Sequence, residues 1–359
     1  MDEEYTGREH TMTIHTEKII LHEDRNVSLV AMVQDCGGEF GKITARPAVL
    51  ILPGGGYSMC SDREAEPVAY PYLAAGYQAF VLRYSIGEHK AWPNPLNDYE
   101  EAMTMIRGKA EEWHIIPDRI AVIGFSAGGH LAAAAATSAI NRPNAAILGY
   151  AATGRPLTDA MHPVHKAVVP NEAVDDQTCP CFIFAARDDT MVPVEENSVP
   201  FMQALAEHAI MYESHIYSYG GHGYSTGNSS IGFMKQSKRI PNWVNDSIGW
   251  LDEVFGTLSS NGMSQPVLFG KMNADREEML SVDCTVGLLR SVEEASPLLT
   301  GVLAATAKVY PTIHDEHSLI SGIVKVMKLR ELMGTFGSDE ASVKAMDSHL
   351  RQIPNPRKA

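Results

Sequence analysis

The sequence predicts an α/β protein with a mostly parallel central sheet, helices on both faces of that sheet, and an additional helical segment at the C-terminal end. Three observations support this prediction. Between residues 11 and 256, short β-rich runs alternate with longer helical stretches, an order typical of strands joined by crossover helices. Most of these runs are continuously apolar, as strands buried on both faces are. Beyond residue 274, apolar residues recur at helical spacing.

The expected strands change in character along the chain. The first two mix apolar and polar residues, which suits an antiparallel edge of a sheet. The later runs are continuously apolar and indicate strands inside a parallel sheet, and one further strand follows them. The expected strands are 12–21, 27–34, 47–52, 78–83, 119–124, 145–150, 181–186 and 213–219.

Helical stretches separate the later strands. Asp98 is the expected N-cap of one helix, which should end before Pro117. The next helix contains the run LAAAAAT, whose small side chains let a helix lie close against a sheet. The only long connection, residues 152–178, is interpreted as a small lid or rim over the carboxyl ends of the strands. The expected helices are 98–114, 127–140, 195–208 and 242–255.

The C-terminal hundred residues differ from the rest. Residues 1–256 are predicted to form one domain, and the polar run TLSSNGMSQP places a linker at 257–273. Residues 274–359 should form three to five helices and no strand. We expect this segment to have a structural role or to join chains into a homo-oligomer; covering part of the active site is the alternative. Its helix signals are a capping box at Ser291–Glu294, a stop at Gly334, and a start at Ser338, Asp339 and Glu340.

Composition excludes several kinds of partner. The 359 residues include 29 Lys and Arg against 44 Asp and Glu, a formal net charge of −15. This charge opposes binding to nucleic acid or to an anionic membrane surface. The N-terminus, MDEEYTGREH, lacks the pattern of a secretory signal. Five cysteines form a sparse, odd set that favours a reducing compartment. We therefore expect a soluble, cytoplasmic protein.

The strongest chemical signal is a G-x-S-x-G motif that runs from Gly124 to Gly128. It lies between a continuously apolar run and a helix of small residues. A serine on such a sharp turn from strand to helix points out of the sheet, and glycines two positions away remove Cβ atoms that would clash. Ser126 is therefore the candidate nucleophile. The Ala127 N–H, at the start of the helix, is available to a developing oxyanion.

A second signal, Pro53-Gly54-Gly55-Gly56-Tyr57, directly follows the strand at 47–52. Three consecutive glycines leave the backbone open, so that its N–H groups can face a ligand. The motif alone also fits a flexible turn or a phosphate cradle. No dinucleotide or P-loop pattern follows it, which favours a role beside the serine.

A nucleophilic serine needs a base and an acid that orients it. Asp188 and Asp189 both follow the strand at 181–186 and both qualify by position. Among 14 histidines, His222 is placed best, because it lies between glycines after the last expected strand. His162 and His165 form an H-x-x-H broken by Pro163, so a polar rim is favoured over a metal site. Cys179 and Cys181 lack a second pair at zinc spacing and are expected to pack in the core.

With these residues in place, the chain resembles the α/β-hydrolase superfamily, and within it the esterase/lipase group that includes acetyl-xylan esterase-like carbohydrate esterases. The similarity covers about residues 12–256. The resemblance implies a Ser126, Asp189 and His222 triad, with Asp189 selected because it precedes Val-Pro by three positions. It also implies oxyanion donors at Gly55, Gly56 and Ala127. The stretches that carry it are LPGGGY (52–57), Arg63–Pro67, GYQAFVLRYS (76–85), WPNPLNDYEEAM (92–103), GFSAGGHLAA (124–133) and DDTMVPVEENS (188–198).

The resemblance also implies an activity. The expected reaction is hydrolysis of short acyl esters of sugars or xylo-oligosaccharides through an acyl-enzyme, with no metal or organic cofactor. One departure is Pro53, where many relatives have the histidine of an HGGG motif. Two alternatives stay open: a serine peptidase of the prolyl-oligopeptidase type, and a non-catalytic binding protein on a hydrolase scaffold. The short segment before the first core strand argues against the peptidase, and the filled triad positions argue against the binding protein.

Overall fold

The computed structural model describes residues 13–38, 41–232, 236–268, 270–315 and 317–357. The chain divides into two compact units, the first ending at Gly270 and the second beginning at Lys271. This point falls inside 257–273, the expected linker. Each unit has a hydrophobic core of its own.

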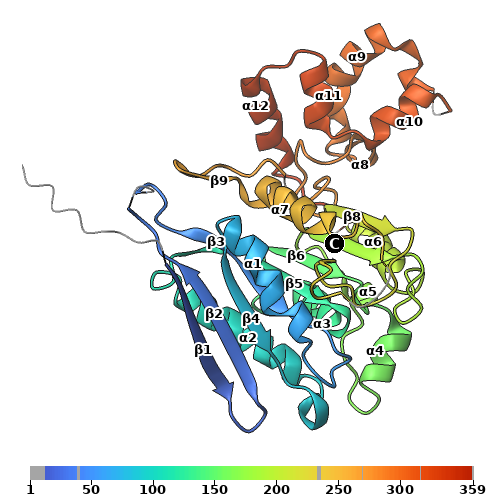
Figure 1. Ribbon diagram of the computed structural model, residues 1–359. Helices are drawn as coiled ribbons and strands as arrows, with labels where there is room; N and C mark the ends of the chain where they lie inside the picture. Colours follow the sequence, from blue (N-terminus) through green and yellow to red (C-terminus); the bar gives the residue numbers. More distant parts are fainter. Residues whose placement is uncertain (1–12, 39–40, 233–235, 269, 316, 358–359) are drawn as a thin grey trace, which may run out of the picture. The chain divides into compact units, whose positions relative to one another are not determined.

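The first unit is built on an eight-stranded sheet with the order β1-β2-β4-β3-β5-β6-β7-β8 (Figure 1). The β1/β2 and β2/β4 pairs are antiparallel, and all pairs from β4 to β8 are parallel. This confirms the predicted mostly parallel sheet with an antiparallel edge. The strands are β1 (Ile14–His22), β2 (Val27–Gln34), β3 (Arg46–Leu52), β4 (Gln78–Arg83), β5 (Ile115–Phe125), β6 (Ala145–Gly149), β7 (Cys181–Ala186) and β8 (Tyr212–Tyr217).

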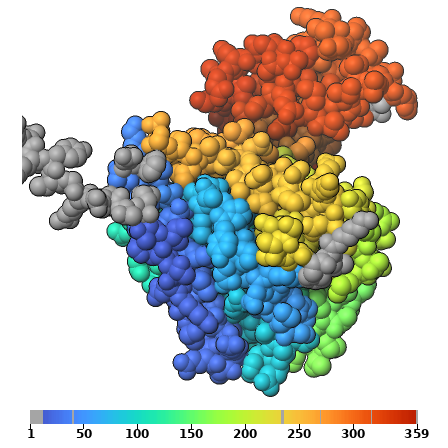
Figure 2. Space-filling view, in the orientation of Figure 1, coloured from blue at the N-terminus to red at the C-terminus, as the bar shows by residue number. Residues whose placement is uncertain are grey.

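Helices cover both faces of this sheet. Successive residues of β3 point to opposite sides, so that Leu50 belongs to one hydrophobic core with residues of α2, α3 and α6, whereas Ile51 belongs to the other with residues of α1 and α7. On the second face, the Tyr72 hydroxyl of α1 lies 2.7 Å from Ser247 Oγ of α7, and the two helices lie side by side (Figure 2). The helices are α1 (Glu66–Ala74), α2 (Asn94–Gly108), α3 (Ser126–Ser138), α4 (Arg155–Met161), α5 (Pro170–Ala173), α6 (Ser198–Glu207) and α7 (Asn242–Phe255).

Two features of these helices differ from the prediction. Helix α1 is not among the expected helices; its Pro67 lies in the first turn, where a missing N–H costs no intrahelical bond, and Pro71 lies inside it. The prediction that Asp98 caps α2 is wrong, since this helix begins at Asn94. Asp98 is buried within it, where it accepts the Ser85 N–H at 2.7 Å and pairs with Arg25.

The two irregular segments of the first unit also contain regular structure. The expected rim, 152–178, carries the short helices α4 and α5. The start of the expected linker forms a small hairpin of β9 (Leu258–Ser259) and β10 (Gly262–Met263). Among the described residues, none of the helices combines the length and the apolar character that crossing a bilayer would require.

The second unit is helical, as predicted. Within its described residues, the β-structure consists of isolated bridges and includes no strand. Two of its expected helix signals are wrong. Ser291 ends α8 and donates its hydroxyl to the Leu288 carbonyl instead of starting a helix, and Gly334 lies inside α11. Asp339 does cap α12, by accepting the Ser342 N–H. Its α-helices are α8 (Val286–Ser291), α9 (Thr300–Val309), α10 (Leu319–Val326), α11 (Leu329–Thr335) and α12 (Glu340–Leu350).

Candidate active site

Ser126 occupies a strained turn between β5 and α3. Its φ is +52°, a left-handed conformation that is unfavourable for a residue with a side chain. The flanking glycines make this turn sterically feasible. A Cβ on Gly124 would lie 2.2 Å from the Gly128 carbonyl oxygen, and one on Gly128 would lie 2.1 Å from that of Leu52. The motif thus holds the serine where β5 meets α3.

His222 joins the serine to an aspartate. Its Nε2 lies 2.9 Å from Ser126 Oγ, and its Nδ1 lies 2.7 Å from Asp189 Oδ2. Because a carboxylate only accepts hydrogen bonds, Nδ1 carries the ring proton and Nε2 is the acceptor that faces the serine hydroxyl. The geometry is that of a nucleophile, a base and the group that orients the base.

The two candidate aspartates have different partners. Asp189 is buried, and its second oxygen accepts the N–H groups of Met191 and Val192 at 2.9 Å each. Asp188 instead accepts the N–H groups of Gly220 and Gly221 at 2.8 and 2.9 Å. Asp188 therefore anchors the loop that presents His222, whereas Asp189 contacts the imidazole itself.

The glycine loop after β3 lies beside the serine turn. A Cβ on Gly54 would come within 3.1 Å of Ser126 Cβ. Gly55 and Gly56 have φ values of +129° and +62°. In the part of the chain that the structure describes, neither donates its N–H to a protein acceptor. Ala127 is the second residue of α3, and the first N–H groups of a helix have no intrahelical acceptor. All three expected oxyanion donors are thus on the segments that adjoin Ser126.

Pro53, the departure from the HGGG pattern, is held by another residue. Its carbonyl oxygen accepts the Tyr84 hydroxyl at 2.6 Å. The next N–H in the loop, that of Gly54, donates to Glu64 Oε2 at 3.0 Å. Both bonds lie in the interior, so the start of the glycine loop is fixed without a histidine.

Glu64 and Tyr150 are site residues that the sequence analysis does not identify. Glu64 is 3 % exposed, and its Oε1 accepts the Tyr150 hydroxyl at 2.5 Å. The Tyr150 ring meets the His222 ring edge-on, with centroids 4.9 Å apart. The only sequence signal for Glu64 is its place in the Arg63–Pro67 block, and a lone tyrosine after β6 gives none.

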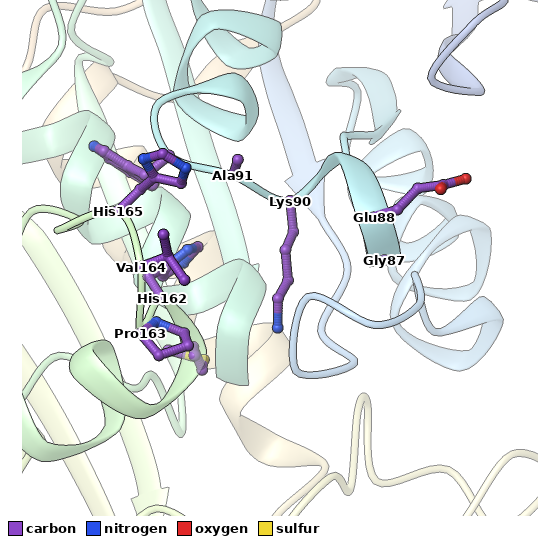
Figure 3. A pocket seen from close by; sticks show the side chains of 10 residues that line it. Gly87, Glu88, Lys90, Ala91, His162, Pro163, Val164 and His165 are labelled. Carbon is purple, nitrogen blue, oxygen red and sulfur yellow. The ribbon is translucent and has the colours of Figure 1, made fainter.

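The rim and the loop after β4 enclose a cavity of about 230 Å³ (Figure 3). His162 and His165, the expected polar rim, both line it, together with Trp92 and Lys90. Its wall is tied to the glycine loop, because the His162 ring packs 4.5 Å from that of Tyr57. The other lining residues are Gly87, Glu88, Ala91, Met161, Pro163 and Val164.

His162, which lines this cavity, and the buried His130, whose ring packs near that of His162, are held neutral. Burial lowers the pKa of His130 to about 3, and burial with the nearby Lys90 lowers that of His162 to about 4. The His130 Nε2–H donates to the Val168 carbonyl at 2.9 Å, so Nδ1 accepts the Tyr57 hydroxyl at 2.7 Å. Among the described residues, no group of three or more His, Cys, Asp or Glu side chains could hold a metal ion.

Comparison with known proteins agrees with this fold. A solved structure, that of MGS-M1, an α/β hydrolase enzyme from a Medee basin deep-sea metagenome library, is 43% identical over 67% of this chain and 98% of its own, with a TM-score of 0.62. The chain belongs to the α/β-hydrolase family. The family model described as BD-FAE matches residues 41–153 of this α/β hydrolase.

Two curated relatives of this α/β hydrolase come from bacteria. Endo-1,4-beta-xylanase B of Butyrivibrio fibrisolvens is 33% identical over 52% of this chain and 34% of its own length. The acetylxylan esterase of Xylanibacter ruminicola is 29% identical over 55% of this chain and 45% of its own. The α/β hydrolase therefore spans less than half the length of these two relatives.

Proposed function

We propose that this α/β hydrolase is a serine carboxylic-ester hydrolase that removes short acyl groups from sugars or xylo-oligosaccharides. The observation that carries the proposal is the continuous chain of hydrogen bonds from Ser126 through His222 to Asp189. A serine turn without chemistry would not need a buried carboxylate behind the histidine that faces the hydroxyl.

The proposed reaction proceeds through an acyl-enzyme. As Ser126 Oγ bonds to the ester carbonyl carbon, its proton passes to His222 Nε2 and the carbonyl π electrons move onto oxygen. The N–H groups of Gly55, Gly56 and Ala127 stabilise this oxyanion. The imidazolium then gives its proton to the leaving alcohol. Water, deprotonated by the same imidazole, releases the acid and restores the serine.

Two features favour a sugar ester as the substrate. One is the similarity to an acetylxylan esterase, a protein that acts on an acetylated sugar polymer. The other is the cavity beside the glycine loop, which offers the Trp92 ring and the nitrogen atoms of Lys90 and His165. An aromatic face can stack on a pyranose ring, and nitrogen donors can bind its oxygens.

The test is a series of p-nitrophenyl esters from acetyl to octanoyl, followed by acetylated xylo-oligosaccharides. The proposal predicts that the rate falls beyond acetyl and that acetate is released from the oligosaccharides. If the protein hydrolyses none of these esters, the proposed esterase activity is refuted. Turnover of the p-nitrophenyl esters without acetate release would refute the sugar substrate alone.

A further inference from the structure

The carboxyl group of Glu64 connects the glycine loop, residues 53–57, to residues 220–225, the histidine loop that presents His222. Its Oε2 accepts the Gly54 N–H at 3.0 Å, and its Oε1 accepts the Tyr150 hydroxyl at 2.5 Å. A Cβ on Gly54 would lie 2.6 Å from Oε2, so only glycine allows this approach. Gly54 directly precedes Gly55 and Gly56. The hydrogen bond that Gly54 donates to Glu64 therefore fixes the start of the segment that carries those two N–H groups.

Glu64 and its neighbour Arg63 also hold the histidine loop in place. The Tyr150 oxygen accepts the Ser225 N–H at 2.9 Å, and the Ser225 hydroxyl donates to the Arg63 carbonyl at 2.5 Å. The Arg63 guanidinium donates to the Gly223 carbonyl at 2.8 Å. Residues 63 and 64 thus hold both neighbours of the base, the glycine loop on one side and residues 223–225 on the other.

Glu64 also carries charge near the base. Burial is the largest effect and raises the pKa of Glu64, although the hydrogen bonds from Tyr150 and Gly54 and the charges of protonated His222 and Arg63 act to lower it. Such a charge interaction is mutual: a carboxylate that is stabilised by the imidazolium stabilises the imidazolium equally. A buried pair of charges interacts more strongly than an exposed pair, because water screens it less.

Other charged groups also face His222. Asp189 contacts its Nδ1 at 2.7 Å, and Asp188 binds the N–H groups of the two preceding residues. Arg63 is the cation bound to the next residue, Gly223. Burial keeps the pKa of Tyr150 and of Tyr224 well above the usual value, so both phenols are neutral. Glu64 differs from Asp188 and Asp189 in that it also accepts a hydrogen bond from the glycine loop.

We propose that Glu64 is a positioning residue of this site with two effects, which rest on the proposed ester hydrolysis. It fixes the glycine loop so that Gly55 and Gly56 point their N–H groups at the oxyanion. It also adds a second negative charge that stabilises protonated His222, the form that exists in the transition state. Both effects lower the barrier to acyl transfer more than they strengthen substrate binding.

The test compares two substitutions that separate shape from charge. Glu64→Gln keeps the length and removes the charge; Glu64→Asp keeps the charge and is too short to reach both partners. With p-nitrophenyl acetate, both should lower kcat by at least about tenfold while KM changes by less than about threefold. Glu66→Gln is the matched control, because the Glu66 carboxylate pairs with Arg83 and belongs to neither loop.

The pH dependence identifies the charge effect. Loss of a nearby negative charge lowers the pKa of His222, so the acid limb of kcat/KM moves to lower pH in Glu64→Gln and stays in place in Glu64→Asp. An NMR titration of the His222 ring in the Ser126→Ala background gives the same shift without relying on activity. If Glu64→Gln does not fold, the kcat of Glu64→Asp decides on the positioning effect.

Three results have different meanings. If the wild type hydrolyses the ester and Glu64→Gln matches its kcat and its pH profile, the role of Glu64 is refuted. A loss that appears only in thermal unfolding, with an unchanged His222 pKa, would reduce Glu64 to a structural residue. If the wild type hydrolyses no ester, the proposed function fails, and the NMR titration still tests the charge interaction.

Discussion

Replacement of Asp189 by asparagine tests which of two adjacent carboxylates orients the base. Asp189 accepts three hydrogen bonds in the interior: from His222 Nδ1, and from the N–H groups of Met191 and Val192. An asparagine keeps one oxygen, which the two backbone N–H groups can retain. Its amide nitrogen then faces His222 and donates, so the imidazole must place its proton on Nε2. A histidine in that state cannot accept the proton of Ser126.

The size of the effect follows from this change of tautomer. The corresponding substitution in a serine protease triad lowers kcat by about 10⁴-fold with intact geometry, which equals about 5.4 kcal/mol of transition-state stabilisation. We expect a loss of this order for Asp189→Asn. Asp188→Asn should lower kcat by no more than a few-fold, because an amide oxygen can still accept the N–H groups of Gly220 and Gly221.

The assay is the steady-state hydrolysis of p-nitrophenyl acetate by both variants at pH 7 to 8, with thermal unfolding as a control for folding. Since both replacements have nearly the same volume, a difference in kcat reports the chemistry of each position. The assignment of Asp189 would be wrong if Asp188→Asn lost activity by orders of magnitude and Asp189→Asn did not. Equal losses in both would show that the histidine loop, not the tautomer, limits the rate.

Further predictions concern stability. Gly128→Ala places a Cβ 2.1 Å from the Leu52 carbonyl oxygen; we expect about 1–3 kcal/mol of lost stability, measured by urea unfolding. Gly249 lies in α7, and a Cβ there would meet no atom within 4 Å, so Gly249→Ala should raise the free energy of unfolding by up to about 1 kcal/mol. Equal effects of the two substitutions would contradict the packing argument. The pKa of His130 is lowered to about 3 in the folded state. The stability that its neutral form contributes is therefore complete above the unfolded pKa of about 6.5. It is lost as the pH falls toward 3, by up to about 1.4 kcal/mol per pH unit. Unfolding curves between pH 7 and 4 measure this slope, which should be smaller in His130→Gln.

The sequence was sufficient for those elements whose signals are local. Continuous apolar runs mark β4 and β7 to the residue, because a strand buried on both faces has no other pattern. Helix α1 escapes prediction because it contains two prolines: Pro67 suits the first turn of a helix, but Pro71 lies in its interior, where a proline removes a backbone hydrogen bond. Asp98 resembles an N-cap by its position after a proline-rich loop, and its burial against Arg25 depends on contacts that are distant in the sequence.

The same distinction applies to the site. Ser126 lies in a motif whose steric requirements can be read from neighbouring residues. The residues alone leave Asp188 and Asp189 as equal candidates, and only the family resemblance selects Asp189. The structure shows how they differ: the Asp189 side chain contacts the histidine ring, and that of Asp188 the backbone before it. Glu64 and Tyr150 lie 86 residues apart, and nothing in the local sequence of either indicates that their side chains meet.

The central claim is that Ser126 forms an acyl-enzyme, and the direct measurement is mass spectrometry of the protein quenched in acid during turnover of p-nitrophenyl acetate. We predict one acetyl group on the peptide that contains Ser126 in the wild type, and neither the acetyl group nor turnover in Ser126→Ala. Folding of that variant is checked by thermal unfolding. An acetyl group on a different residue, or hydrolysis by Ser126→Ala at the wild-type rate, would contradict the account.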